Sequence, residues 1–107
     1  MKRGEVWWIN FDPAVGEEIQ KKRPAVIVSN DISNKHLKRF QVVPLTSNVD
    51  RLYPSEAYIT LNDKRGKAMA DQLATVSKLR FINKAGILSE SDMEAIGKVI
   101  KIQLGLS

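Results

Sequence analysis

A short apolar run, residues 25–28 (AVIV), lies between Pro24 and the turn-forming residues 29–31 (SND). β-Branched residues in so short a run, with turn residues at its end, predict a buried strand. Pro24 favours an extended backbone at Arg23 and stiffens the start of that strand. Residues 16–23 carry two acidic and three basic side chains. A charged loop held by a buried strand is typical of a functional site.

Strand patterns recur along most of the chain. Residues 4–11 (GEVWWINF) alternate, with Val6, Trp8 and Asn10 on one face. We expect the Trp7-Trp8 pair to serve packing rather than base stacking. Further strands are expected over residues 25–29, 40–45 and 57–61.

The second half of the chain is broken by turns. Pro44 predicts an edge strand, or a strand that stops there. Residues 62–66 (NDKRG) predict a turn, and residues 67–73 a fifth strand or extended piece that residues 74–76 can continue. Residues 77–88 are expected to be irregular, and residues 34–39 (NKHLKR) form a basic patch in a connection.

Helical spacing is confined to the last segment, where Met93, Ile96, Ile100 and Leu104 recur on one face. Ser91, followed three residues later by an acid, predicts a capping box. A glycine at position 105 suits the position after a helix. We therefore expect a helix over residues 91–103.

About five short strands followed by one terminal helix predict a mainly β (α+β) fold. The expected architecture is a small antiparallel barrel or curled sheet covered by that helix. A length of 107 residues predicts one domain, residues 1–107, small enough to gain from dimerisation.

The composition is that of an ordinary globular protein, with 43% hydrophobic and 27% charged residues. A net charge of +5 and a pI of about 9.6 favour a polyanionic partner, although a soluble basic surface would show the same charge. The absence of cysteine excludes disulfides and thiol chemistry. The first residues lack the apolar region of a signal peptide, so we expect a cytoplasmic protein without a membrane partner.

Common enzyme signatures are absent: there is no P-loop, dinucleotide-binding fingerprint or zinc spacing. His36, the single histidine, lies in a basic segment and is expected to be a solvated surface residue. The aspartates at positions 12, 31, 63 and 71 are scattered. We expect no metal and no cofactor.

The polar residues that remain are suited to metal-free RNA cleavage. That reaction needs a base for the 2′-hydroxyl, a stabiliser of the phosphorane and a proton for the leaving oxygen. Arg23 offers a fork that fits phosphate, and Thr46 offers a hydroxyl donor. The residues alone favour plainer explanations, which are an ion pair of Arg23 with Glu17 or Glu18 and a turn hydroxyl at Thr46.

Three segments in this order resemble the MazF/PemK family of toxin endoribonucleases. They are residues 4–31 (GEVWWINFDPAVGEEIQKKRPAVIVSND), 44–47 (PLTS) and 70–73 (ADQL). The resemblance covers nearly the whole chain, and its most specific block runs from the Gly16-x-Glu18 loop through Arg23-Pro24 to Asn30-Asp31.

The resemblance implies an SH3-like antiparallel barrel, a fold shared with gyrase-poisoning toxins, with a C-terminal helix. It implies a homodimer that belongs to a type II toxin-antitoxin system and works as an mRNA interferase. Single-stranded mRNA would be cut at a short sequence without metal, by 2′-hydroxyl attack, leaving 2′,3′-cyclic phosphate and 5′-hydroxyl ends and inhibiting translation and growth. A cognate antitoxin would occupy the RNA groove with an acidic tail.

By the same resemblance Arg23 and Thr46 correspond to the catalytic pair, and Glu18 to an acidic loop residue. A guanidinium is always protonated, so Arg23 is expected to stabilise the phosphorane, and Glu18 is the better base if a protein base is needed. Ala74 stands where many relatives carry a basic residue, for which Lys78 or Arg80 is a candidate substitute. The expected RNA-binding residues are Gln20, Lys21, Lys22, Ser47, Gln72, Lys78 and Arg80.

Two alternatives stay open at this point. One is a non-enzymatic toxin of the same fold that poisons DNA gyrase, and the other is a non-catalytic RNA-binding barrel. Neither alternative needs Arg23 and Thr46 together.

Overall fold

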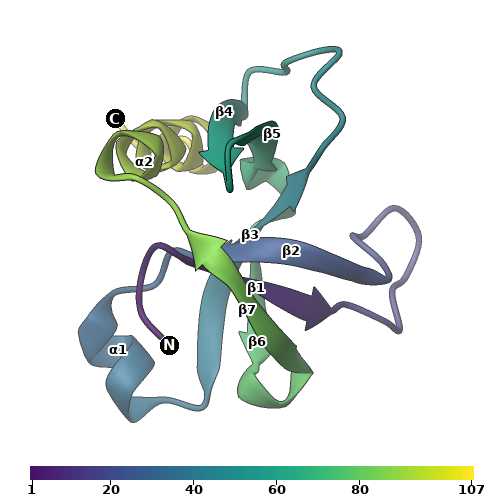
Figure 1. Cartoon of the computed structure of the whole chain (residues 1–107), viewed down its shortest axis with the longest axis vertical. Coiled ribbons are helices and arrows are strands. Elements are labelled where there is room, and N and C mark those ends of the chain that lie inside the picture. Colours follow the sequence, from purple (N-terminus) through teal and green to yellow (C-terminus); the bar gives the residue numbers. More distant parts are fainter.

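A computed structural model describes all 107 residues. Seven strands form an antiparallel sheet in the order β4-β5-β3-β2-β1-β7, with β6 paired to β3 (Figure 1). The expected mainly β fold with a C-terminal helix is confirmed. The elements are β1 (Glu5–Asn10), β2 (Lys22–Ile27), α1 (Asp31–His36), β3 (Arg39–Thr46), β4 (Glu56–Leu61), β5 (Lys64–Met69), the 3-10 turn η1 (Ala70–Gln72), β6 (Ala74–Ser77), the 3-10 turn η2 (Lys78–Arg80), β7 (Phe81–Ile87) and α2 (Glu90–Leu104).

The central strand β3 changes partners along its length. On one side it pairs with β2; on the other it pairs first with β6, through Val42, and then with β5, from Leu45 onward. The expectation that Pro44 marks an edge strand or a strand end is therefore wrong. Pro44 is fully buried within β3 and pairs with Ala25, at the break between the β6 and β5 ladders. A residue without an N–H is tolerated where a ladder is interrupted.

The sheet buries apolar side chains on both faces. Along β2, Val26 belongs to one core, whereas Ala25 and Ile27 belong to the other, as the two-residue period of a strand requires. The first core also contains Ile96 of α2, which covers that face beside β4 (Figure 1). The second core contains Phe40 and extends toward β6. Burial on both faces explains the uninterrupted apolar run that the sequence shows in β2.

The terminal helix is confirmed, with bounds one residue beyond each expected end. The capping box at Ser91 is wrong. Ser89 is the N-cap residue instead, and its Oγ accepts a hydrogen bond from the N–H of Asp92 at 3.1 Å. Gly105 ends the helix with a φ of +70°, as expected. No helix has the length and apolar character needed to cross a membrane.

Two connections are more regular than expected. Residues 77–88 contain strand β7, which pairs with β1 through irregular registers and so lacks a simple alternation. The first three residues of the basic segment, 34–36, form the end of helix α1. Asn30 caps this helix, and its Oδ1 accepts a hydrogen bond from the N–H of Ser33 at 2.8 Å. Strand β5 begins earlier than expected because Asn62 and Asp63 alone make the turn, both with positive φ.

Candidate active site

A cavity of about 540 Å³ opens where the start of β2 and the end of β3 meet the β4–β5 hairpin. We call it the cationic pocket, because its lining includes five cationic side chains and no carboxylate. A concentration of positive charge without internal counter-charges favours an anionic ligand. The polar lining consists of Lys21, Lys22, Arg23, Thr46, Ser47, Asn62, Lys64 and Arg65, and the remainder of Trp8, Pro24, Leu45, Ile59, Leu61 and Gly66.

Arg23 stands in this pocket with most of its hydrogen-bonding capacity unused. Its Nε donates to the carbonyl of Gln20 at 3.2 Å. The structure contains three ion pairs, formed by Glu5 and Glu56, and none involves Arg23. The ion pair with Glu17 or Glu18 that the residues alone favoured is therefore absent. The terminal guanidinium nitrogens make no internal hydrogen bond and can bind phosphate oxygens.

Thr46 ends β3 at the rim of the same pocket. Its Oγ1 accepts a hydrogen bond from the N–H of Asn48 at 3.2 Å, so the turn-hydroxyl interpretation is correct for the oxygen. The hydroxyl hydrogen remains available for a ligand, because a hydroxyl is both acceptor and donor.

Gly66 fixes how closely β5 approaches Thr46. A Cβ atom at position 66 would lie 2.9 Å from the carbonyl oxygen of Thr46. Any larger residue would push the two strands apart. The close pairing of β3 and β5 therefore sets the position of Thr46 in the pocket.

A buried ion pair anchors the β3–β4 loop at the pocket's border. Lys67 Nζ lies 2.8 Å from Glu56 Oε1 and donates to the carbonyl of Arg51 at 2.6 Å. The same Glu56 oxygen accepts the N–H of Tyr53 at 2.9 Å. Only 7% and 8% of the two charged side chains are exposed, so this lysine is committed to the fold.

The sequence analysis missed part of the pocket. Lys64 and Arg65 follow the turn of the β4–β5 hairpin, and Arg65 lies 4.0 Å from the centroid of the Tyr58 ring. The signal was the basic pair after Asn62-Asp63, interpreted only as part of a turn. Trp8 is 40% exposed and lines the pocket, whereas Trp7 packs edge-on against Phe81. The packing expected for the tryptophan pair therefore describes Trp7 only.

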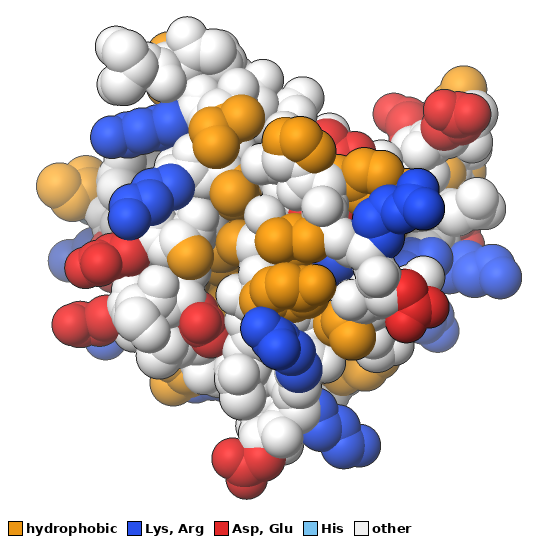
Figure 2. Space-filling model, turned by 90° about the horizontal axis from the view of Figure 1, so that it is seen from above, with side chains coloured by type: hydrophobic (Ala, Val, Ile, Leu, Met, Phe, Trp, Pro, Cys, Tyr) orange, Lys and Arg blue, Asp and Glu red, His pale blue; other side chains and the backbone are white.

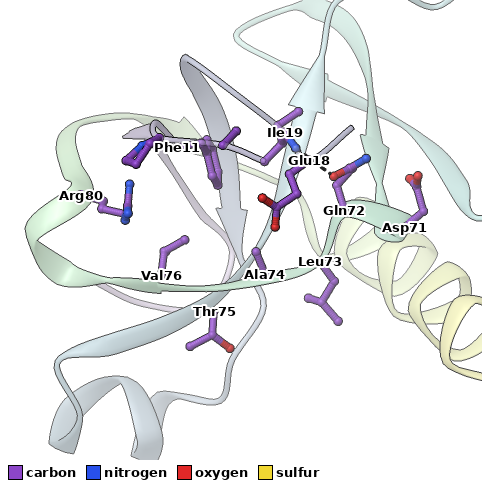
Figure 3. A pocket seen from close by; sticks show the side chains of 12 residues that line it. Phe11, Glu18, Ile19, Asp71, Gln72, Leu73, Ala74, Thr75, Val76 and Arg80 are labelled. Atoms are coloured by element: carbon purple, nitrogen blue, oxygen red, sulfur yellow. Dashed lines mark hydrogen bonds between the residues drawn. The ribbon is translucent and has the colours of Figure 1, made fainter. Parts of the chain in front are cut away.

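A second cavity, of about 400 Å³, lies beneath the β1–β2 connection, and we call it the loop pocket (Figure 3). Glu18, Gln72 and Arg80 line it together with Phe11 and Val76. Figure 3 shows Glu18 and Gln72 toward one end and Arg80 at the other, with apolar side chains between them.

Polar groups of the loop pocket bind the chain's own backbone. Gln72 Oε1 accepts the N–H of Ile19 at 3.2 Å, and Glu18 Oε1 accepts the N–H of Val15 at 2.7 Å. Arg80 Nη1 donates to the carbonyls of Asn10 at 3.1 Å and Asp12 at 2.6 Å. These contacts hold the β1–β2 connection against η1 and η2.

The expected site residues thus divide into groups. The cationic pocket brings together Arg23, Thr46, Lys21, Lys22 and Ser47. Glu18, Gln72 and Arg80 line the loop pocket instead. The side chain of Gln20 is exposed, and Lys78 lies at a third cavity beside α1. No three His, Cys, Asp or Glu side chains are grouped so that they could hold a metal ion.

The family described as "PemK-like, MazF-like toxin of type II toxin-antitoxin system" matches residues 2–104. The chain belongs to this family. Endoribonuclease MazF9 of Mycobacterium tuberculosis is 33% identical to this MazF-like chain, with 99% of the chain and 98% of the relative aligned. Endoribonuclease toxin MazF of Escherichia coli K12 is 29% identical over 95% of the chain and 92% of its own length.

Solved structures agree with this assignment. A mycobacterial endoribonuclease in complex with its cognate antitoxin has 25% identity and a TM-score of 0.84, with 100% of this chain and 97% of that chain covered. MazF from Deinococcus radiodurans, at 24% identity, matches the fold with a TM-score of 0.88 over 99% of this chain and 97% of its own. Both the family and the fold that the sequence resemblance implied are confirmed.

Proposed function

We propose that this protein is the toxin of a type II toxin-antitoxin system and cleaves single-stranded mRNA as a sequence-specific, metal-independent endoribonuclease. The observation that carries the proposal is the joint presence of Arg23 and Thr46 in a pocket with cations and no carboxylate. The activity printed for the related proteins, endoribonuclease, supports it. A gyrase poison would not need this pair, and a non-catalytic RNA binder would need positive charge alone.

In the proposed reaction the 2′-oxygen attacks the adjacent phosphorus and loses its proton to a base. The bond from phosphorus to the 5′-oxygen breaks, and the leaving oxygen takes up a proton. The products are a 2′,3′-cyclic phosphate and a 5′-hydroxyl. Arg23 binds the non-bridging oxygens and stabilises the charge of the phosphorane, and Thr46 donates its hydroxyl hydrogen to the same phosphate.

The residues around this pair bind the flanking RNA in our proposal. Lys21, Lys22 and Ser47 border the same cavity, so they can contact neighbouring phosphates. Gln20 precedes them along the chain, and Gln72 and Arg80 contribute by holding the β1–β2 connection beside the RNA path.

Glu18 is the proposed base, and this role requires its side chain to move. Its carboxylate lines the loop pocket, so it has to turn toward the cationic pocket when RNA binds. The pH dependence of cleavage by Glu18→Gln tests this role. Loss of the acidic limb of the profile supports Glu18 as the base, and an unchanged profile means that no base is supplied by this residue.

The cellular location, the oligomeric state and the inhibitor of the protein are also proposals. We propose a cytoplasmic homodimer whose whole chain, residues 1–107, is one toxin endoribonuclease domain. A cognate antitoxin inhibits it, which the mycobacterial complex supports by analogy. Light scattering of the purified protein, alone and with the antitoxin, measures both assemblies.

The test is to incubate the purified protein with a long RNA in EDTA and to map both ends of each fragment. We expect cuts at one short sequence, with cyclic phosphate and 5′-hydroxyl ends. A 2′-deoxy nucleotide placed before the cut should abolish cleavage there. Intact RNA, 5′-phosphate ends or cleavage of the deoxy substrate would contradict the proposal.

A further inference from the structure

A third cavity, of about 580 Å³, lies at the opposite end of β3 from Thr46. Its lining comes from the N-terminus, α1, the start of β3 and η2. Figure 1 shows the N-terminus and α1 close together in the lower part of the molecule. We call this cavity the α1 groove. Lysines and a histidine line it together with apolar side chains, which are Lys2, Lys35, His36, Lys38 and Lys78 with Met1, Leu37 and Phe40.

The four lysines of the α1 groove share its lining with a single carboxylate. None of the ion pairs in the structure includes them. The one carboxylate in the lining, Asp31, accepts hydrogen bonds from the N–H of Arg3 at 2.8 Å and from Asn34 Nδ2 at 3.1 Å. Asp31 therefore serves the start of α1, and its charge also interacts with that of Lys2, which leaves Lys35, Lys38 and Lys78 without a counter-charge in the lining.

Two of these lysines are fixed next to each other by the backbone. The N–H of Lys78 donates to the carbonyl of Lys38 at 2.9 Å, and the adjacent residues Arg39 and Ser77 are paired across β3 and β6. Both lysine side chains are exposed and line the groove, and neither forms an ion pair. An external polyanion can therefore bind both charges.

We propose that the α1 groove binds the phosphate backbone of the same single-stranded RNA, outside the sequence that is cut. The inference rests on the proposed endoribonuclease function. Lysines at the rim suit phosphates, and the apolar side chains of Met1 and Leu37 offer surface to the bases. Phe40, the aromatic residue of the lining, is 2% exposed and belongs to the second core. Leu79, 95% exposed beside Lys78, adds an apolar contact at the rim.

The spacing of the two sites determines which RNAs reach both. Strand β3 runs from the α1 groove to the cationic pocket over eight residues, which is roughly 23 Å. An oligonucleotide that only spans the cut occupies the cationic pocket alone. A longer RNA can contact both ends of the strand, so the groove should raise affinity for long substrates only. Figure 2, seen from above the view of Figure 1, shows lysine and arginine side chains around a central hydrophobic group on that face, with acidic side chains among them.

The test compares Lys35→Gln/Lys38→Gln with the control Lys98→Gln/Lys101→Gln, which removes two exposed lysines from α2. Each protein is given a long RNA and a short oligonucleotide with the same cut site. We expect the KM for the long RNA to rise about tenfold in the groove variant only. The slope of log affinity against log salt should fall by about 1.4, or about 0.7 for each lost phosphate contact. The short oligonucleotide should be cut with unchanged KM.

Further arms separate the possible failures. Lys35→Arg/Lys38→Arg keeps both charges and should bind long RNA as the wild type does. Equal KM and equal salt slope for the wild type and the Gln variant would overturn the inference, and so would a loss of antitoxin binding with RNA binding intact. Binding is also measured on long RNA carrying a 2′-deoxy nucleotide at the cut. If the wild type cuts no RNA, the endoribonuclease proposal fails, while this binding comparison still decides the groove.

Discussion

The cationic pocket and the loop pocket each contain an arginine, and the two arginines differ in how many groups of the protein they bind. Arg80 of the loop pocket donates to two backbone carbonyls, and Gln72 and Glu18 each accept a backbone N–H. Arg23 of the cationic pocket makes one hydrogen bond, through Nε, and no ion pair. Residue type therefore does not distinguish an arginine that builds the fold from one that is kept for a ligand; the number of internal partners, two for Arg80 and one for Arg23, does.

The largest expected effect comes from Arg23 and Thr46. Replacing either by alanine should lower the cleavage rate at least about a hundredfold, because a donor to the developing charge is lost. The melting temperature should stay at the wild-type value, since neither side chain holds another element in place. Gel analysis of RNA fragments and thermal unfolding measure the two effects. A strong drop in melting temperature would show that these residues stabilise the fold, as the loop-pocket residues do.

Lys67 is a cation near the cationic pocket whose charge binds groups within the protein, so it is the opposite case to Arg23. Lys67→Met should lower the free energy of unfolding by about 3 kcal/mol, since Glu56 is then left as a buried, unpaired carboxylate. Replacing both residues together, as Lys67→Met/Glu56→Leu, should recover much of that loss. Urea unfolding is the measurement, and Lys64→Met is the matched control at an exposed position. Equal stability of Lys67→Met and Lys64→Met would show that the fold does not need the ion pair between Lys67 and Glu56.

Gly66 connects the fold to the position of Thr46. Gly66→Ala should lower stability by about 1 to 3 kcal/mol and reduce cleavage as well, because the new Cβ meets the Thr46 carbonyl at 2.9 Å. Gly97→Ala is the control: no atom lies within 4 Å of its Cβ, and α2 should gain about 0.5 to 1 kcal/mol. Full cleavage by a destabilised Gly66→Ala would show that Thr46 is positioned by something else.

The same contrast explains what the sequence could and could not predict. The pair Arg23 and Thr46 was expected only from the family resemblance, whereas the buried run of β2 and the terminal helix follow from patterns that lie within single segments. Strand β7 did not, because its conformation depends on pairing with β1 through an irregular register. The distribution of site residues between two pockets did not either. It depends on where the β1–β2 connection lies against η1, which no local pattern records.

Replacing Arg80 should have a smaller effect than replacing Arg23, and the effect should be mainly on stability rather than on cleavage. Arg80→Ala removes two hydrogen bonds from a charged group to the backbone at Asn10 and Asp12, so stability should fall by about 1 to 2 kcal/mol. Cleavage should fall less than in Arg23→Ala. Limited proteolysis should cut the β1–β2 connection faster than in the wild type. Wild-type proteolysis together with a collapse of activity would assign Arg80 directly to the RNA.

The smallest expected effect is on the pH dependence of stability, at Glu5. This residue extends the comparison of internal partners from the arginines to a carboxylate. Burial acts to raise the pKa of the Glu5 carboxyl, but hydrogen bonds from Trp7 and the Lys2 backbone, together with the terminal amine and Lys84, lower it below the ordinary value of 4.5. A lowered pKa in the folded state means that the carboxylate stabilises the fold above about pH 4.5. That contribution is lost as the pH falls through the folded-state value.

Glu5→Gln should therefore flatten the loss of stability on acidification, with a small decrease in stability at neutral pH. Unfolding measured between pH 3 and pH 7 tests this, with Glu94→Gln on the exposed side of α2 as the control. An acid transition in Glu5→Gln identical to that of the wild type would show that this carboxylate, despite its internal partners, contributes nothing to stability. Partner number would then fail as a criterion for acids while still separating the two arginines.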